Sequence, residues 1–164
     1  MTWTYAEVGA TRDGVRPPGY RWLNVRHRLG RGDVAGVGEA LLTWRLHAAA
    51  GITLAADAPR AAPGVGAEAR LGIGPLRLPA PCRVVWVEEG ARRYGFGYGT
   101  LPGHVFVGEE AFTVERDADG VVWFVVQAFS RPARWPLQLA RPAVALGQRA
   151  FVGRLAAGAR SLLS

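Results

Sequence analysis

The hydrophobic pattern of residues 20–51 predicts one strand followed by one helix. Apolar and polar residues alternate from Tyr20 to Leu29, as in a strand with one buried face. The sequence Gly30-Arg31-Gly32 interrupts this alternation, and Asp33 stands where the N-cap of a helix belongs. Apolar residues then recur at helical spacing, so we expect a helix that ends near Gly51.

The middle of the chain predicts a series of antiparallel strands. Strand-like patterns occupy residues 65–73, 82–89, 92–100, 109–116 and 121–130, and residues 55–64 are expected to form a loop. Short turns separate several of these strands, among them Gly74-Pro75 and Asp117-Ala118-Asp119-Gly120. Because short turns join neighbouring antiparallel strands, residues 65–130 are predicted to form a meander.

Residues from about 136 to 163 are predicted to form a long closing helix. Their apolar residues recur at helical spacing and form one continuous stripe, made by Leu137, Val144, Phe151, Leu155 and Leu162. The chain of 164 residues is therefore expected to be a single domain, residues 1–164, of the α+β class.

Composition and charge narrow the class of protein further. The net charge is +7, but arginine supplies all 20 basic residues and these are spread along the chain, as a GC-rich genome would produce. Nucleic acid is therefore not the favoured partner, since aromatic interleaving and known binding motifs are absent. The one cysteine, Cys82, excludes an internal disulfide framework. Without a secretory signal or an apolar stretch of spanning length, we expect a soluble, cytoplasmic protein with no membrane partner.

The segment from Tyr94 to Glu110 is the most informative for function. In a strand, Tyr94, Phe96, Tyr98 and Thr100 share one face and three glycines share the other, which requires a bend or a close neighbour. Glu110 falls on the apolar face of the next strand, where a carboxylate needs a hydrogen-bond donor or a raised pKa. We expect a ligand-binding site made by Tyr94, Tyr98, Thr100, His104, Glu109, Glu110 and Trp123.

Catalytic and metal-binding motifs are weak in this sequence. No serine lies in a G-x-S-x-G motif, and Cys82 begins a buried strand, so we expect it to be an inert thiol. His104 with Glu109 and Glu110 could hold a metal ion, but any short loop can show such a trio. We therefore expect neither a metal nor a cofactor, and the catalytic residues of any reaction stay unknown.

Several motifs together resemble the bacterial and plant family catalogued as domain of unknown function nineteen-ninety. They are Val8-Gly9-Ala10-Thr11, Pro81-Cys82-Arg83-Val84-Val85, the segment from Tyr98 to His104, Gly108-Glu109-Glu110 and Ala128-Phe129-Ser130-Arg131-Pro132. The family looks like a relative of the START and Bet v 1-like superfamily. The resemblance implies a helix-grip fold, in which a curved antiparallel sheet wraps around a long C-terminal helix. The order of elements predicted above fits this layout.

These observations leave three functions open. The first is the binding of a small, largely apolar ligand in a cavity between the sheet and the C-terminal helix. The second is an enzyme like a cyclase or dehydratase, with His104 or Glu110 as the general acid or base. The third is an interaction of the arginine-bearing surface with nucleic acid or an acidic partner. The first is preferred, and the oligomeric state is not predicted.

Overall fold

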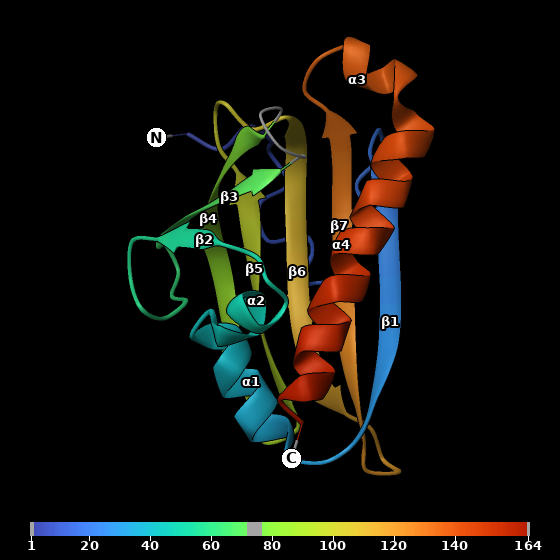
Figure 1. Cartoon of the computed structure of the whole chain (residues 1–164). Helices are drawn as coiled ribbons and strands as arrows, with labels where there is room; N and C mark the ends of the chain where they lie inside the picture. The colour runs from blue at the N-terminus through green and yellow to red at the C-terminus, as the bar shows by residue number, and fades with distance from the viewer. Residues whose placement is uncertain (1, 72–76, 164) are drawn as a thin grey trace.

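The computed structural model describes residues 2–71 and 77–163 and is built on one seven-stranded antiparallel sheet (Figure 1). The order across the sheet is β1-β7-β6-β5-β4-β3-β2, so consecutive strands from β2 to β7 are neighbours and the predicted meander is confirmed. The Gly74-Pro75 turn lies outside the described residues. The strands are β1 (Arg21–Arg31), β2 (Leu54–Ala56), β3 (Gly66–Leu71), β4 (Leu78–Glu89), β5 (Arg93–Thr100), β6 (Phe106–Arg116) and β7 (Val121–Pro132).

The sequence pattern did not predict the neighbour of β1 or the existence of β2. β1 was predicted as a strand, and in the structure it pairs antiparallel with β7 from the far end of the chain, so that Val25 faces Val126. β2 lies at the beginning of a segment that was expected to be a loop, and it pairs with β3 through only three residues. Both pairings depend on contacts between distant segments, which local periodicity does not report.

The predicted helix after β1 is broken into α1 (Val34–Leu42) and α2 (Arg45–Ala49). Asp33 caps α1 as predicted, because its carboxylate accepts hydrogen bonds from the backbone nitrogens of Ala35 and Gly36, each at 3.0 Å. The break falls at Trp44, whose φ of 65° is the left-handed conformation that a bulky side chain rarely adopts. The Trp44 indole nitrogen donates to the carbonyl of Ala58 at 2.9 Å, so a tertiary contact accompanies this backbone.

The main core lies between the concave face of the sheet and the helices α1, α2 and α4 (Arg141–Ser161), and the short helix α3 (Pro136–Leu139) precedes α4 at one end of the molecule (Figure 1). From the predicted stripe of α4, Leu155 is fully buried, and Phe151 is partly buried against the core. The side chain of Leu137 lies outside the described residues. The fully buried members of this core include Phe96, Phe112, Phe124, Leu41 and Leu46.

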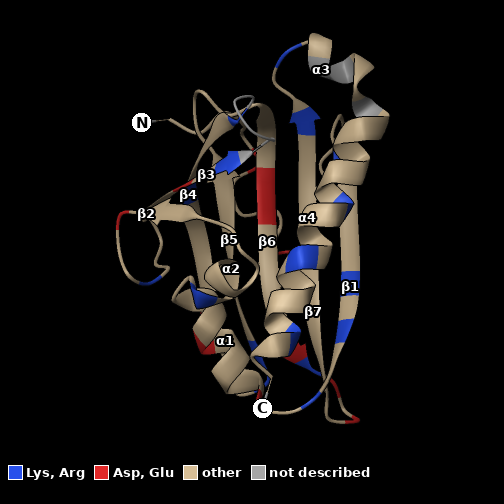
Figure 2. Cartoon of the chain, viewed as in Figure 1, with Lys and Arg blue, Asp and Glu red and all other residues tan. Residues whose placement is uncertain are grey.

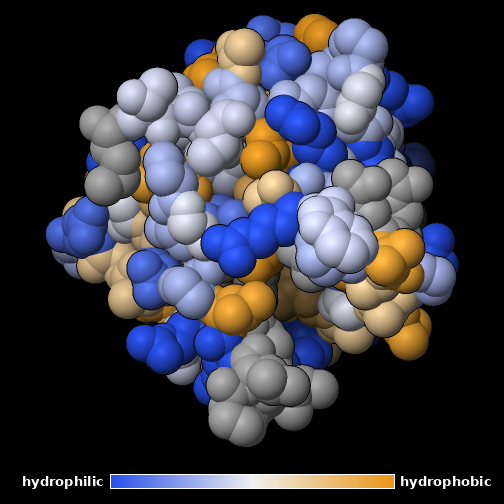
Figure 3. Space-filling view, turned by 90° about the horizontal axis from the view of Figure 1, so that it is seen from above, coloured by the Kyte–Doolittle hydropathy of each residue, from blue (hydrophilic) through white to orange (hydrophobic). Residues whose placement is uncertain are grey.

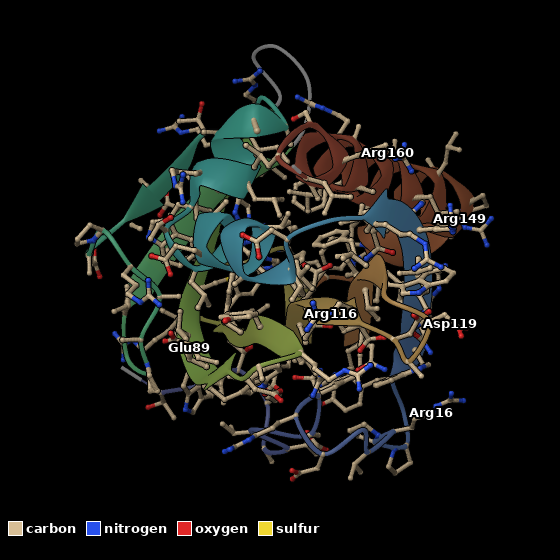
Figure 4. All side chains as sticks on the ribbon, turned by 90° about the horizontal axis from the view of Figure 1, so that it is seen from below. Arg16, Glu89, Arg116, Asp119, Arg149 and Arg160 are labelled. Atoms are coloured by element: carbon tan, nitrogen blue, oxygen red, sulfur yellow. The ribbon has the colours of Figure 1, made fainter. Side chains whose placement is uncertain are left out.

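The N-terminal segment, residues 2–20, covers part of the opposite, convex face of the sheet. Tyr5 and Ala10 of this segment pack against Phe129 of β7 in a second apolar cluster. Seen from below, the segment with Arg16 lies on the far side of the sheet from α4 (Figure 4). Gly99 of β5 permits this covering, because a Cβ there would lie 2.8 Å from Cε1 of Tyr5. A Cβ at Gly97 would lie 2.6 Å from Cε2 of Trp86 on β4, so a close neighbour explains this glycine too.

Candidate functional site

The concave face carries a carboxylate, Glu110, beside the hydroxyl of Tyr98. The two residues are paired across β5 and β6, and the Tyr98 hydroxyl donates to Oε2 of Glu110 at 3.3 Å. Burial raises the pKa of Glu110 to about 7, against the lowering effect of the Tyr98 hydrogen bond. Burial, together with the Glu110 charge, raises the pKa of Tyr98 well above its ordinary value. Glu110 therefore exchanges its proton near neutral pH, while Tyr98 stays a hydrogen-bond donor.

Cys82 lies on the same face, on the neighbouring strand β4. It precedes by two residues Val84, which is the partner of Tyr98, so the side chains of Cys82 and Tyr98 point to the same side of the sheet. Burial first, and then the charge of Glu110, raise the pKa of the Cys82 thiol well above its ordinary value. A protonated, buried thiol is a weak nucleophile, so Cys82 contributes packing to this face.

Below this pair, the concave face continues as an aromatic wall. The ring centroid of Phe112 lies 5.3 Å from that of Tyr98 and 5.6 Å from that of Phe96, and the centroids of Phe96 and Tyr98 are 5.8 Å apart. We call Phe96, Tyr98 and Phe112 the aromatic wall. The aromatic wall is the apolar surface next to the Glu110 carboxylate and the Tyr98 hydroxyl.

His47 of α2 lies against the aromatic wall and is the functional candidate that the sequence did not reveal. Its ring centroid is 5.8 Å from that of Phe112 and 6.2 Å from that of Phe96, and only 1% of its surface is exposed. Neither ring nitrogen has a hydrogen-bond partner among residues 2–71 and 77–163. Burial lowers the pKa of His47 to about 4, so the imidazole is neutral at physiological pH. Its place three residues after Trp44 on an apolar helix was the available signal.

Glu109, which was expected beside Glu110, belongs instead to the convex face. Its buried carboxylate accepts hydrogen bonds from the hydroxyl of Tyr5 at 2.7 Å, the nitrogen of Gly9 at 2.8 Å and the nitrogen of Thr11 at 3.1 Å. The hydroxyl of Thr11 is a further partner. All four donors come from the N-terminal segment, so Glu109 fastens this segment to β6. Figure 2 shows the Glu109-Glu110 pair as a red band in the upper part of β6.

Trp123 is also separated from the concave site, because it pairs with Glu115 at a convex-face position. The guanidinium of Arg26 lies 4.0 Å from the centre of the Trp123 ring, and the indole nitrogen donates to Oδ2 of Asp117 at 2.8 Å. Tyr94 does lie on the concave face, but at the far end of β5, where its ring packs against Gly38 of α1. Neither residue joins Tyr98 and Glu110.

Thr100 and His104 are engaged in the loop between β5 and β6. The Thr100 hydroxyl accepts from the nitrogen of Gly108 at 3.0 Å and lies 2.6 Å from the hydroxyl of Thr4. Nδ1 of His104 accepts from the nitrogen of Phe106 at 2.9 Å. Burial lowers the pKa of His104 to about 4, so this imidazole is neutral and holds the loop. Within residues 2–71 and 77–163, no three His, Cys, Asp or Glu side chains are placed to hold a metal ion.

A surface groove of about 500 Å³ runs beside α2. It is lined by Thr43, Trp44, Arg45, Ala48 and residues 51–54. Trp44 also packs against Phe96, with ring centroids 5.3 Å apart. Trp44 therefore both lines the groove and contacts the aromatic wall.

The curved antiparallel sheet and the C-terminal helix form a helix-grip fold. The crystal structure of ginseng major latex-like protein 151 from Panax ginseng aligns with a TM-score of 0.59, covering 87% of this chain and 96% of that one at 13% identity. The crystal structure of human STARD10 aligns with a TM-score of 0.59, covering 84% of this chain and 62% of that one at 9% identity. These likenesses confirm the predicted START and Bet v 1-like fold.

The chain belongs to the family described as domain of unknown function (DUF1990), whose sequence profile matches residues 4–158. A UPF0548 protein from Deinococcus radiodurans is 36% identical over 159 residues, which cover 89% of this chain and 80% of that protein. The resemblance found from the short motifs is thereby confirmed.

Proposed function

We propose that this protein binds a small, largely apolar molecule on the concave side of the sheet, against the aromatic wall. The observation that carries the proposal is His47, whose two ring nitrogens are buried without any hydrogen-bond partner. A buried polar group in this condition lowers stability by about 1–3 kcal/mol, and its retention calls for a functional reason. A ligand with one polar group could supply the partner that the protein lacks.

Glu110 and Tyr98 provide the second polar contact of the proposed site. They lie on the wall that also contacts His47, and they offer a hydroxyl donor and a carboxyl group that is readily protonated. Apolar surface with a few oriented polar groups is the usual composition of a small-molecule site. We infer that a displacement of α2 exposes Phe96 and Phe112, which are fully buried in the structure. The apolar body of the ligand then packs on these two rings, and its polar groups meet His47 and Glu110.

The groove beside α2 offers the route of entry. Trp44 lines this groove and packs against Phe96, and α2 is a five-residue helix without a side-chain cap at its start. Rotation of this short helix would open the aromatic wall to the groove. The unusual backbone of Trp44 is a form of local strain that favours such a movement.

The test is a titration of the purified protein with Nile red, a neutral apolar dye that fluoresces in apolar surroundings. We expect binding to the wild type and an affinity about tenfold lower in His47→Leu and in Glu110→Gln, which each remove one polar contact. The matched control is Trp123→Phe, a change on the convex face that should leave the affinity unchanged. Absence of dye binding, or equal affinity in all four proteins, would overturn the proposal. Native mass spectrometry of the untreated protein would identify a ligand that co-purifies.

A second candidate function, acid–base catalysis, is favoured by Glu110 alone. A carboxyl group with a pKa of about 7 can accept and return a proton near neutral pH, and the Tyr98 hydroxyl beside it can polarise a carbonyl. His104 has no part in this version, because its Nδ1 is used by the loop. Turnover of the co-purified ligand that is lost in Glu110→Gln would favour the enzyme over the binding protein.

A further inference from the structure

Three large apolar side chains are exposed within one stretch of twelve residues, 135–146, where α3 leads into the first half of α4. We call residues 134–149 the α3–α4 corner. The exposed fractions are 73% for Trp135, 78% for Leu139 and 71% for Leu146. Single exposed leucines are ordinary, but this concentration in one short segment marks an interaction surface. The corner stands beyond the carboxyl end of β7 (Figure 1), at an end where hydrophobic residues reach the surface among hydrophilic ones (Figure 3).

The corner also lies in the most basic part of the chain. From Gly120 to Ser164 the sequence has six arginines and neither aspartate nor glutamate. Arg134 and Arg149 are exposed, and neither belongs to an ion pair within the described residues. Figure 4 shows Arg149 at the outer edge of the molecule, beside α4. These two guanidinium groups are therefore available to an anionic partner.

The arginines farther along α4 serve a different purpose. Arg154 donates to the carbonyl of Gly51 at 3.1 Å, and Arg160 donates to the carbonyl of Arg28 at 2.8 Å. They fasten the second half of α4 to the rest of the protein. Within the described residues of α4, an exposed leucine and an arginine without an ion pair therefore occur together in the first half of the helix, and the second half is held to the protein.

We propose that the α3–α4 corner docks onto the surface of an anionic lipid membrane. Trp135, Leu139 and Leu146 would enter the boundary between headgroups and acyl chains, where tryptophan and leucine are favoured. Arg134 and Arg149 would contact the lipid phosphates, which attract basic side chains at close range. None of the helices described in residues 2–71 and 77–163 is long and apolar enough to cross a bilayer, so the contact is peripheral.

The exposed leucines favour a membrane over nucleic acid as the partner. Nucleic acid binding would use the arginines on phosphates and could stack a base on Trp135. It would give no role to Leu139 and Leu146, which are more exposed than most apolar residues of the chain. A lipid surface accounts for both the charges and the aliphatic side chains.

The test is co-sedimentation of the ligand-free protein with vesicles. We expect binding to phosphatidylcholine vesicles that contain phosphatidylglycerol, weaker binding to pure phosphatidylcholine, and a loss of binding as salt rises. The double variant Trp135→Ser/Leu139→Ser should bind about tenfold more weakly, because two apolar side chains no longer enter the bilayer. Arg134→Gln/Arg149→Gln should reduce binding to the anionic vesicles alone.

The matched control is Val15→Ser, which removes an apolar side chain that is 53% exposed on the N-terminal segment. It should bind vesicles as the wild type does, and all variants should keep their melting temperatures because the changed residues are exposed. Failure of the wild type to sediment with anionic vesicles would overturn the proposal. So would wild-type binding by the Trp135 double variant, or binding to short duplex DNA in place of vesicles. Because no ligand is added, these results are independent of the Nile red titration.

Discussion

Glu109 and Glu110 are adjacent in the sequence, and their carboxylates lie on opposite faces of the sheet in opposite surroundings. Glu109 accepts hydrogen bonds from four donors of the N-terminal segment, whereas in the described part of the chain the one side-chain donor to Glu110 is the Tyr98 hydroxyl. One carboxylate is thus a structural anchor, and the other is poised to change its charge. Substitutions that treat the two residues alike should therefore have different effects.

Glu109→Gln should lower the free energy of unfolding by about 3 kcal/mol, because the amide offers a donor to groups that are themselves donors. Urea denaturation near neutral pH measures this loss. The control is Glu68→Gln, an exposed carboxylate on β3, which should change stability by less than about 0.5 kcal/mol. Equal stability of the two variants would contradict the anchoring role of Glu109.

Glu110→Gln should stabilise the protein at alkaline pH and have little effect at acidic pH. The folded-state pKa of Glu110 is about 7, above the ordinary 4.5, because burial disfavours the charged form. The folded protein thus retains a proton that the unfolded chain releases, and wild-type stability falls as pH rises from 4.5 to 7. The variant, which stays neutral, should be more stable at about pH 8 by about 2–3 kcal/mol. Parallel stability profiles from about pH 5 to pH 8 would contradict the pKa shift.

His47→Leu should make the protein more stable near neutral pH, by about 1–3 kcal/mol, because it removes two buried nitrogens without partners. It should also reduce the sensitivity to acid. The folded-state pKa of His47 is about 4, so between 6.5 and 4 the unfolded chain binds a proton that the folded protein excludes. Wild-type stability is therefore lost as pH falls through this window, by about 3 kcal/mol from this residue.

The measurement is urea denaturation of both proteins at a series of pH values. His104 and Glu110 titrate in the same range, but they are present in both proteins, so their contributions cancel in the difference. A difference between wild type and His47→Leu that does not change with pH would contradict the burial of a neutral imidazole.

Gly97→Val should lower the melting temperature substantially, by about 5 °C or more, because an added side chain has no space beside the Trp86 indole. Differential scanning fluorimetry measures this change. The control is Gly153→Ala on α4, where a Cβ meets no atom within 4 Å. An unchanged melting temperature in Gly97→Val would mean that the indole moves aside freely.

The sequence predicted most of the sheet because its strands alternate and its turns are short. The face assignment of Tyr98 and Glu110 followed directly from the period of two, and the register confirms it. The hairpin at residues 117–120 and the closing helix were local signals of the same kind. These are features that a segment determines largely by itself.

The missed features depend on which distant segment covers each face. Periodicity shows that Glu109 and Glu110 point in opposite directions, but it does not show that the N-terminal segment supplies donors to Glu109. The left-handed Trp44 depends on a hydrogen bond to Ala58 and on packing against Phe96. The same packing buries His47, which in sequence alone is one more polar residue near the end of a helix.

The anchoring of the N-terminal segment by β6 also means that this segment cannot reach its folded position until late in synthesis. Tyr5 is separated by 104 residues from Glu109, the residue that binds it. At the usual rate of about 5–20 residues per second, Tyr5 leaves the ribosome roughly 5–20 seconds before its partner is made. β1 waits about as long for β7, because the two strands pair residues that are between 90 (Arg31 and Val121) and 109 (Arg21 and Ser130) positions apart in the chain. For that interval both segments are free to meet other chains, so this protein is most open to misassembly and to chaperones before β6 emerges.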